Sequence, residues 1–260
     1  MKLTTILNSE YEKVEEKVDK KIFKNKSKKM YELIKLAQDW FFEAHSAPNY
    51  RLMHYYVIKK IKEISFTSDD ITELCFYAQD FKKYDSYQHK PTRVTFDYDS
   101  NEEYIGLFLS ALIFIDQEHS KKAKEYHLVT SEFEMNLHFI GMKNKRSTIS
   151  VQGDVGDYLG KEMEGGKIIV QGNAERYVGD QMTNGEIYIQ GNAGSLMGDC
   201  MTDGNIIIEK NAGDAIGNGM SGGKIWINGD MGEIASTMTL PYTKKGEIYH
   251  KGEKVKLPFP

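Results

Sequence analysis

Histidine and aspartate are the side chains of this 260-residue sequence whose type and spacing could support catalysis or metal binding. Six of the seven histidines precede residue 140. Asp116 and His119 are three residues apart near an expected helix end, while His127 and His138 fall on separate expected strands. None of these spacings is the HExxH or clustered Cys/His pattern that a metal site requires. We therefore expect the histidines to be structural or to lie at the surface.

Four aspartates are the nearest candidates for a carboxylate-based reaction such as glycoside hydrolysis, which needs two carboxyl groups close together. They are Asp157, Asp180, Asp199 and Asp214. Turn or surface roles are the favoured interpretation, because the four are expected to occupy different positions of the repeat described below. The N-terminal half also lacks a GxSxG elbow, a GxxxxGK[ST] phosphate loop and a strand-turn-helix GxGxxG. No catalytic residue, metal or cofactor is predicted. The sequence therefore favours a protein without enzymatic activity.

Composition argues against several other classes of protein. Cys75 and Cys200 are the only cysteines, so a disulfide framework or a CxxC pair is absent. The formal net charge of −4 disfavours nucleic-acid binding, and the lysines of residues 13–35 alternate with acidic residues as on a solvated helix. The longest apolar run, residues 105–115, is too short for a membrane span, and the first residues are too polar for a signal peptide. A cytoplasmic location is expected.

The strongest signal in the sequence is a repeat of 19 residues. Isoleucine recurs at this spacing, Val or Ile follows two positions later, and glycine and methionine form columns of the same period. The columns are Ile149, Ile168, Ile187, Ile206 and Ile225; Val151, Val170, Ile189, Ile208 and Ile227; Gly160, Gly179, Gly198 and Gly217; and Met163, Met182, Met201 and Met220. A β-branched repeat without helix-length segments predicts a right-handed parallel β-helix in which each unit forms one coil.

A polar column supports the same architecture, and we call it the asparagine ladder: Asp154, Asn173, Asn192, Asn211 and Asp230. Stacked asparagine amides can hydrogen-bond from coil to coil, and asparagine tolerates the left-handed backbone that a corner needs. Stacked aspartates would instead repel by roughly 3 kcal/mol per neighbouring pair at an effective dielectric near 20. Aspartate accordingly stands only at the two ends of the column.

Alternation along each strand predicts an outward-facing apolar column, which we call the outer stripe: Ile169, Tyr188, Ile207 and Trp226. Ser150 precedes it, and a neighbouring polar column contains Gln152, Gln171, Gln190, Glu209 and Asn228. Because an external apolar stripe tends to be covered, we expect the N-terminal helices of the chain to pack on it. A partner subunit, a second copy of the chain, or a glycan or other ligand are the alternatives.

The first half is predicted to be a mainly helical domain of unknown type spanning residues 1–143, followed by the β-helix and its cap over residues 144–260. Helical spacing covers residues 11–22 after a Ser9–Glu12 capping box, then 30–44, 50–64, 71–78 after Thr67 or Ser68, and 104–115. Strand patterns cover 94–98, 126–130 and 137–142, and the last two could form a first, irregular coil.

The C-terminal end departs from the repeat after Gly232. The strand-like segment Glu247–Tyr249 comes four residues later than the period requires, and a lysine-rich stretch with Pro258 finishes the chain. We expect this region to form a terminal cap, because an open β-helix end would template pairing with another chain.

The repeat, which contains runs such as GDVGDYLGKEMEGGKIIVQGN and GNAGSLMGDCMTDGNIII, resembles the GXGXG β-helix family over about Lys145 to Ile234. That fold forms the C-terminal domain of the glutamate synthase large subunit and occurs in one of the subunits of formylmethanofuran dehydrogenase. The resemblance implies a supporting domain beside catalytic domains in the first case, and one component of a molybdenum or tungsten complex in the second. An N-terminal nucleophilic cysteine, an iron-sulfur cysteine cluster and a flavin-binding domain do not occur in this sequence.

The function predicted from these observations is that of a non-catalytic scaffold, assembly or docking module. The expected partner is another protein or a second copy of the chain, and neither nucleic acid nor a membrane is expected. An accessory subunit of an oxidoreductase or amidotransferase complex, and a ligand-binding or glycan-binding β-helix, are the alternatives.

Overall fold

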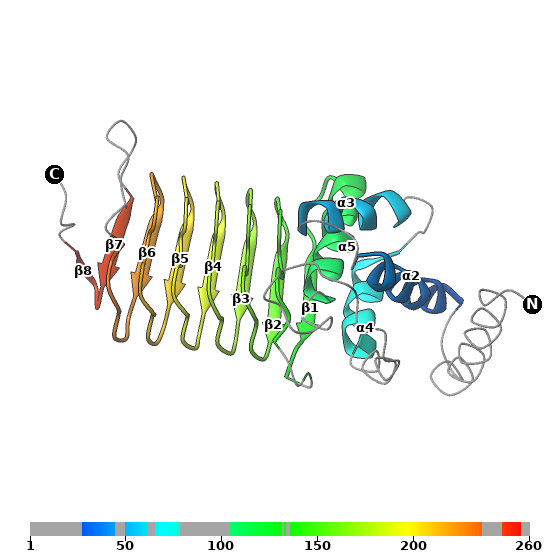
Figure 1. The fold of residues 1–260 in the computed structure, drawn as a ribbon, viewed down its shortest axis with the longest axis horizontal. Helices are drawn as coiled ribbons and strands as arrows, with labels where there is room; N and C mark the ends of the chain where they lie inside the picture. The colour runs from blue at the N-terminus through cyan, green and yellow to red at the C-terminus, as the bar shows by residue number, and fades with distance from the viewer. Residues whose placement is uncertain are drawn as a thin grey trace, which may run out of the picture.

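The computed structural model describes residues 28–44, 50–61, 66–78, 105–131, 133, 136–235 and 246–255. Within these ranges the helices come first and a stack of β-strands follows (Figure 1). The expected helix over residues 11–22 and the expected strand over 94–98 lie outside the described residues. This order confirms the predicted class, a helical part followed by a parallel β-solenoid.

Four expected helices occur close to their predicted positions in the described ranges. They are α2 (Lys28–Ala44), α3 (Tyr50–Ile61), α4 (Ser68–Ala78) and α5 (Ile105–Ser120). The start of α4 has the geometry of a capping box, because Asp70 accepts the Thr67 N–H at 2.7 Å and donates its own N–H to Thr67 Oγ1 at 3.3 Å. Helix α5 is buried almost all round, as expected for a helix that is apolar on every face.

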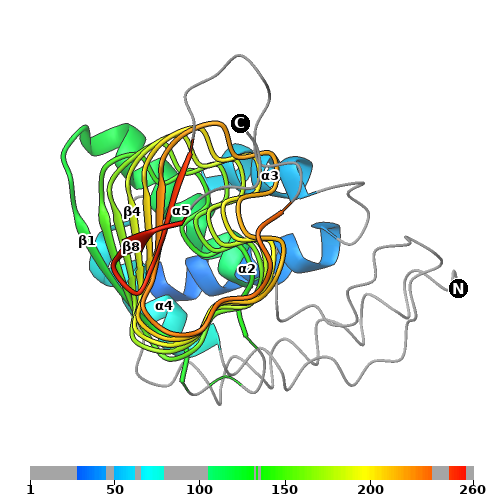
Figure 2. The same ribbon diagram turned by 90° about the vertical axis from the view of Figure 1, so that its left-hand side faces the viewer.

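The strands form one sheet in chain order, and Figure 2 shows the coils superimposed when viewed from the end. The strands are β1 (Glu125–Val129), β2 (Thr148–Gln152), β3 (Lys167–Val170), β4 (Glu186–Ile189), β5 (Asn205–Ile208), β6 (Lys224–Ile227), β7 (Glu247–His250) and β8 (Glu253–Lys254). Strands β1 to β7 are parallel, and residues from β2 to β6 pair with residues 19 positions later. The predicted coil length is therefore confirmed.

The interior of the solenoid consists of the predicted Ile, Val and Met columns. Every Ile and Met of those columns that faces inward is fully buried, for example Ile187, Met182 and Ile206 at 0% exposure. A second inner face carries parallel bridges between Val155, Ala174, Ala193, Ala212 and Met231. Stacking identical side chains directly above one another removes apolar surface from water in every coil, which is the main stabilising contribution here.

Glycine columns make room for these inward side chains. Gly198 has φ 66°, and a Cβ there would lie 2.7 Å from Cδ1 of Ile225 in the following coil. A Cβ on Gly223 would lie 2.5 Å from Cε of Met201 in the preceding coil. The glycines are therefore required both by the left-handed backbone and by the close packing of isoleucine and methionine.

Each coil also contains left-handed residues that are not glycine. One column has φ values between 57° and 64° and contains Phe139, Tyr158, Tyr177, Leu196 and Ala215; another contains Lys143, Glu162, Gln181 and Cys200. The segment over residues 137–142 was predicted as a strand, and this is wrong: it is the left-handed turn of the first coil. The turn geometry directs its apolar residues to the core. The resulting sequence pattern is the same alternation of apolar residues that a strand would have.

The N-terminal helices close the β1 end of the solenoid (Figure 1). Ser110 of α5 donates its hydroxyl to the Phe139 carbonyl at 2.8 Å and accepts the Gly141 N–H at 2.9 Å. A Cβ on Gly106 would lie 2.0 Å from the His138 carbonyl oxygen, so only glycine permits this approach. Helix α5 therefore takes the place of a preceding coil.

Helix α4 protects the outer edge of β1. Thr72 Oγ1 accepts the His127 N–H at 3.4 Å, and the Cys75 thiol lies 3.6 Å from the Val129 carbonyl oxygen. Burial raises the pKa of Cys75 to about 12, so this thiol stays protonated and inert. These contacts occupy backbone groups that would otherwise template the pairing of another strand.

At the opposite end, β7 was expected to belong to a cap, but it continues the parallel sheet. Ile248 pairs with Ile225 and Tyr249 with Trp226, although the spacing is 23 residues rather than 19. The antiparallel strand β8 then turns back on β7 and ends the sheet. The predicted cap is thus confined to β8 within the described residues, and the predicted boundary between residues 143 and 144 lies after β1, the first strand of the sheet.

Replacing Gly198 with Ala should test the glycine column. We expect the free energy of unfolding, measured by urea denaturation, to fall by about 3 kcal/mol, the sum of a left-handed penalty and overpacking against Ile225. Gly219→Ala is the matched control, since Gly219 has φ 65° and its added Cβ meets only Cys200, with Sγ at 3.1 Å. The free energy of unfolding of Gly219→Ala should fall by about 1 kcal/mol. Equal losses in the two variants would contradict the packing role.

His54 of α3 should make stability depend on pH. It is buried beside Phe114, its Nε2 has no hydrogen-bond partner, and burial lowers its pKa to about 4. The unfolded chain gains this proton near pH 6.5 and the folded chain does not, so stability falls as the pH drops, by about 2 kcal/mol between pH 7 and pH 5. His54→Leu should remove this slope in urea titrations, whereas His127→Gln at an exposed position should leave it unchanged.

Candidate functional site

The outer stripe lies on the outward face of the sheet, with its members in register. Ile169, Tyr188, Ile207 and Trp226 occupy equivalent positions of β3 to β6, and each is only partly buried. Pairing of β6 with β7 adds Tyr249, whose ring stacks on Trp226 with centroids 5.4 Å apart and planes 13° apart. We include Tyr249 in the outer stripe from here on. Sequence reasoning missed it because the 23-residue spacing breaks the period.

The described N-terminal helices do not cover the outer stripe. They gather at the β1 end of the solenoid, where α4 packs on β1 (Figure 1). The expectation that these helices would cover the stripe is therefore wrong for the helices that the structure describes. The physical reason is that the open end of a β-helix exposes backbone groups as well as apolar core, so it has the greater need of a cover.

A column of alternating charge runs along one side of the outer stripe, and we call it the charged column: Lys167, Glu186, Asn205, Lys224 and Glu247. Lys167 Nζ lies 2.6 Å from Glu186, and Lys224 Nζ lies 3.5 Å from Glu247. Glu247 also bonds to Lys254 and accepts the Tyr249 hydroxyl at 2.9 Å, and these donors lower its pKa to about 2. Glu247 is therefore ionised at neutral pH.

The polar column borders the other side of the outer stripe. Asn228 Nδ2 donates to Glu209 Oε2 at 3.0 Å. The hydroxyl of Tyr188 is hydrogen-bonded to Glu209, and this bond raises the pKa of Tyr188. The stripe is thus an apolar and aromatic band between two polar borders, which is the usual pattern of a protein interface with an apolar centre and a polar rim.

The asparagine ladder is present, but its geometry differs from the expectation. From Asp154 to Asn211, the side-chain oxygen accepts the backbone N–H of the equivalent residue in the next coil, as when Asn173 Oδ1 accepts the Asn192 N–H at 2.8 Å and Asn192 Oδ1 accepts the Asn211 N–H at 3.1 Å. Amide donation between side chains also occurs, from Asn192 to Asn173 at 3.0 Å. The predicted left-handed backbone is wrong for this column, because the positive φ values occur at other columns of the coil.

All four candidate aspartates have partners within the solenoid, and the structure corrects their predicted placement. Asp180 and Asp199 occupy equivalent positions of successive coils, and Asp157 and Asp214 share another column. Asp180 forms a buried ion pair with Lys161, and Asp199 accepts Asn218 Nδ2 at 2.7 Å. Asp157 is bound by Arg176 at 2.7 Å. Their carboxyl groups therefore stabilise the coils.

The Lys161–Asp180 pair belongs to a cluster that sequence reasoning missed. Lys161 Nζ lies 5.0 Å from the ring centroids of both Tyr50 and Tyr158, which is cation–π geometry. Tyr50 comes from α3, and its neighbour Arg51 binds Glu162 at 2.9 Å. Burial opposes the charge of Glu162, but bonds from Arg51 and Lys143 lower its pKa. The cluster fastens α3 to the left-handed turns, and each charge in it is neutralised.

One group in the described part of the chain has three potential metal ligands, namely His138, Asp157 and Glu175, whose ligand atoms lie within 4.8 Å of one another. Protein donors already use these atoms. His138 Nδ1 accepts the Asp157 N–H at 2.7 Å, and Asn136 Nδ2 donates to Glu175 at 2.9 Å. The Arg176 cation bound to Asp157 would also repel a metal ion, so the group is a hydrogen-bond network between coils.

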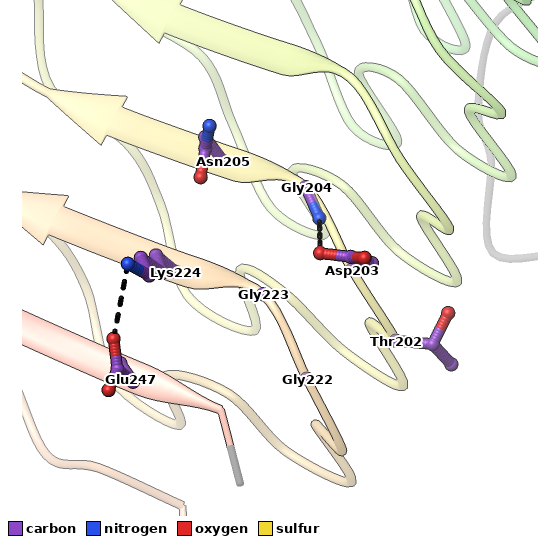
Figure 3. Close-up of a pocket in the computed structure, with 8 residues that line it drawn as sticks. All are labelled: Thr202, Asp203, Gly204, Asn205, Gly222, Gly223, Lys224 and Glu247. Carbon is purple, nitrogen blue, oxygen red and sulfur yellow. Dashed lines mark hydrogen bonds and ion pairs between the residues drawn. The ribbon is translucent and has the colours of Figure 1, made fainter. Parts of the chain in front are cut away.

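A surface hollow of about 300 Å³ lies beside the starts of β5, β6 and β7. Figure 3 shows the residues that line it. The lining residues are Thr202, Asp203, Gly204, Asn205, Gly222, Gly223, Lys224 and Glu247. Asp203 accepts the Gly204 N–H at 2.8 Å, and Lys224 and Glu247 pair with each other. The hollow borders the charged column and contains turn residues rather than a nucleophile with a base.

No protein-family profile and no curated protein matches this chain. The structure defines the chain as a parallel β-solenoid protein with a helical N-terminal cover, and the resemblance to the GXGXG family stays a prediction based on the residue columns. None of the described helices is both long enough and apolar enough to span a bilayer.

Removing one rung of the asparagine ladder should weaken the stack. Asn192→Ala deletes the acceptor of the Asn211 N–H, so we expect the free energy of unfolding to fall by about 1 kcal/mol in urea titrations. Gln190→Ala, two residues earlier at an exposed position, is the control and should change it by less than about 0.5 kcal/mol. An unchanged urea midpoint for Asn192→Ala would show that water replaces the ladder without loss.

Proposed function

We propose that this chain is a non-catalytic scaffold or docking module that assembles with protein through the outward face of its β-sheet. The observation that carries the proposal is the outer stripe, which places apolar or aromatic side chains in register on five successive parallel strands. A continuous apolar band of this kind on a surface is typical of an interaction site.

The rigidity of the sheet supports a docking role. The backbone of β3 to β7 is paired on both sides, and the inward side chains of β3 to β6 are fully buried. A partner therefore meets a surface that is already ordered, and little conformational entropy is lost on binding. Tyrosine and tryptophan contribute large contact areas at low entropic cost and are enriched at interfaces.

The charges of the described residues also favour protein over nucleic acid as the partner. The charged column alternates between Lys and Glu instead of presenting a basic surface, and the whole chain has a formal net charge of −4. Cys75 and Cys200 are both free thiols, which fits a reducing compartment such as the cytoplasm. An oxidoreductase or amidotransferase is the type of partner that the GXGXG resemblance implies.

The proposal can be tested by native purification followed by mass spectrometry of the co-eluting chains. We expect the wild-type protein to elute at an increased mass with a stoichiometric protein partner. The double variant Tyr188→Glu/Trp226→Glu should lose at least nine-tenths of that partner, because it places two charges within the apolar band.

The matched control is Gln171→Glu/Gln190→Glu, which adds the same charge to the neighbouring polar column and should keep the partner. Circular dichroism of both variants should show the wild-type spectrum. A wild-type chain that stays monomeric under all conditions, or a partner that the stripe variant retains, would count against the docking role.

A further inference from the structure

The order of charges in the charged column is antisymmetric about its centre. Reading from β3 to β7, the column is Lys167, Glu186, Asn205, Lys224 and Glu247, so the signs are plus, minus, neutral, plus and minus. Reversing the order of the strands exchanges every plus with a minus and leaves the central Asn205 opposite itself. A column with this property is complementary to its own reversed copy.

On the basis of the proposed function, we infer that the protein docked on the outer stripe is a second copy of this chain. The two sheets lie face to face with their solenoid axes antiparallel, related by a twofold axis that runs along β5. This operation places β3 against β7 of the second copy, β4 against β6, and β5 against β5. Such isologous contacts are the commonest in homodimers.

The apolar residues match under the same operation. Ile169 meets Tyr249 of the second copy, Tyr188 meets Trp226, and Ile207 meets its own equivalent on the axis. At β2, the strand beyond the matched set, the outward residue is the small polar Ser150. The apolar band therefore begins and ends where the symmetric contact does.

The charges select the antiparallel arrangement. Lys167 meets Glu247 of the second copy and Glu186 meets Lys224, so each intrachain ion pair is joined by a second pair of opposite sign. A copy with parallel axes would instead oppose the charged column to the polar column, and Glu247 with Lys251 would be the one pair of opposite charges among the described residues of these columns. Complementary charges of this kind determine orientation and partner choice more than affinity.

One like-charged meeting occurs in the antiparallel arrangement, at Glu209 beside the axis. This carboxylate accepts hydrogen bonds from Asn228 and Tyr188 of its own chain, which disperse its charge. Glu209→Gln should therefore tighten self-association, whereas the same change should not favour an unrelated partner.

The contact is small. Five strands about 4.8 Å apart, with four residues of about 3.3 Å each, give a face of about 24 by 13 Å, or about 300 Å² on each copy. A stable interface buries about 800 Å² on each partner, so the dimer is expected to be weak and dependent on concentration.

Cross-linking of single cysteines tests the register, using the full-length chain with Cys200→Ser to remove the exposed thiol. Ile207→Cys should give a covalent dimer with a short bismaleimide, because the two thiols meet on the axis. Ile169→Cys alone should not, since its equivalents lie four strands apart across the dimer. Combining Ile169→Cys with Tyr249→Cys should restore the product.

A charge exchange tests the orientation by analytical ultracentrifugation. Lys224→Glu alone and Glu186→Lys alone should each self-associate at least tenfold more weakly than the wild type, because like charges then meet across the interface. An equimolar mixture should dimerise again, since the two variants complement each other at both positions. Circular dichroism confirms that both variants are folded.

Cross-linking at Ile169 rather than Ile207, or a mixture that stays monomeric, would overturn the inferred dimer. If the chain does not associate with itself, but the stripe variants lose a different protein that co-purifies with the wild type, the docking role stands and the second copy is excluded. If the chain does not associate with itself, and the stripe variants keep every protein that co-purifies with the wild type, both proposals are wrong.

Discussion

The columns of this solenoid depend on the constant length of its coils from β2 to β6. Because successive strands pair with a shift of 19 residues, each side chain has its neighbours fixed as the residues 19 positions before and after it. A residue that suits one coil must therefore also suit the same position in the coils on either side. This condition explains why glycine, isoleucine and methionine stand in unbroken columns, and why a left-handed turn in one coil requires a left-handed turn in the next.

The left-handed residues show how the stack sustains a conformation that single residues avoid. Tyr158 and Cys200 have φ values of 64° and 53°, which are unfavourable for side chains of this kind. Their N–H groups donate to carbonyls of the following coil, at 2.9 Å from Tyr158 to Arg176 and at 2.7 Å from Cys200 to Asn218. The hydrogen bonds between coils thus hold the strained backbone, and the aromatic rings of Phe139, Tyr158 and Tyr177 stack above one another as a consequence.

The same regularity separates the charges that stabilise the fold from those available at the surface. Lys161, Asp180 and Asp157 are buried and neutralised by partners in adjacent coils or in α3. These three groups therefore stabilise the fold and are not available to bind a partner. The charged column lies outside, beside an apolar stripe that the described helices leave uncovered. A constant coil length converts the order of charges along the chain into an order in space, so that a symmetric partner can match it strand by strand.

The solenoid, its period, its inward columns, the asparagine ladder and the positions of α2 to α5 could be predicted from the residue pattern, because each is a local pattern or a spacing that recurs. The packing of the helices, the addition of β7 to the sheet and the extension of the outer stripe by Tyr249 became evident only in three dimensions. The tertiary structure also brought Tyr50 of α3 onto Lys161. These depend on contacts between distant segments or on a broken period, and no local spacing encodes them. The turn at Phe139 was missed for a related reason, since its apolar alternation arises from left-handed residues that sequence alone does not distinguish from a strand.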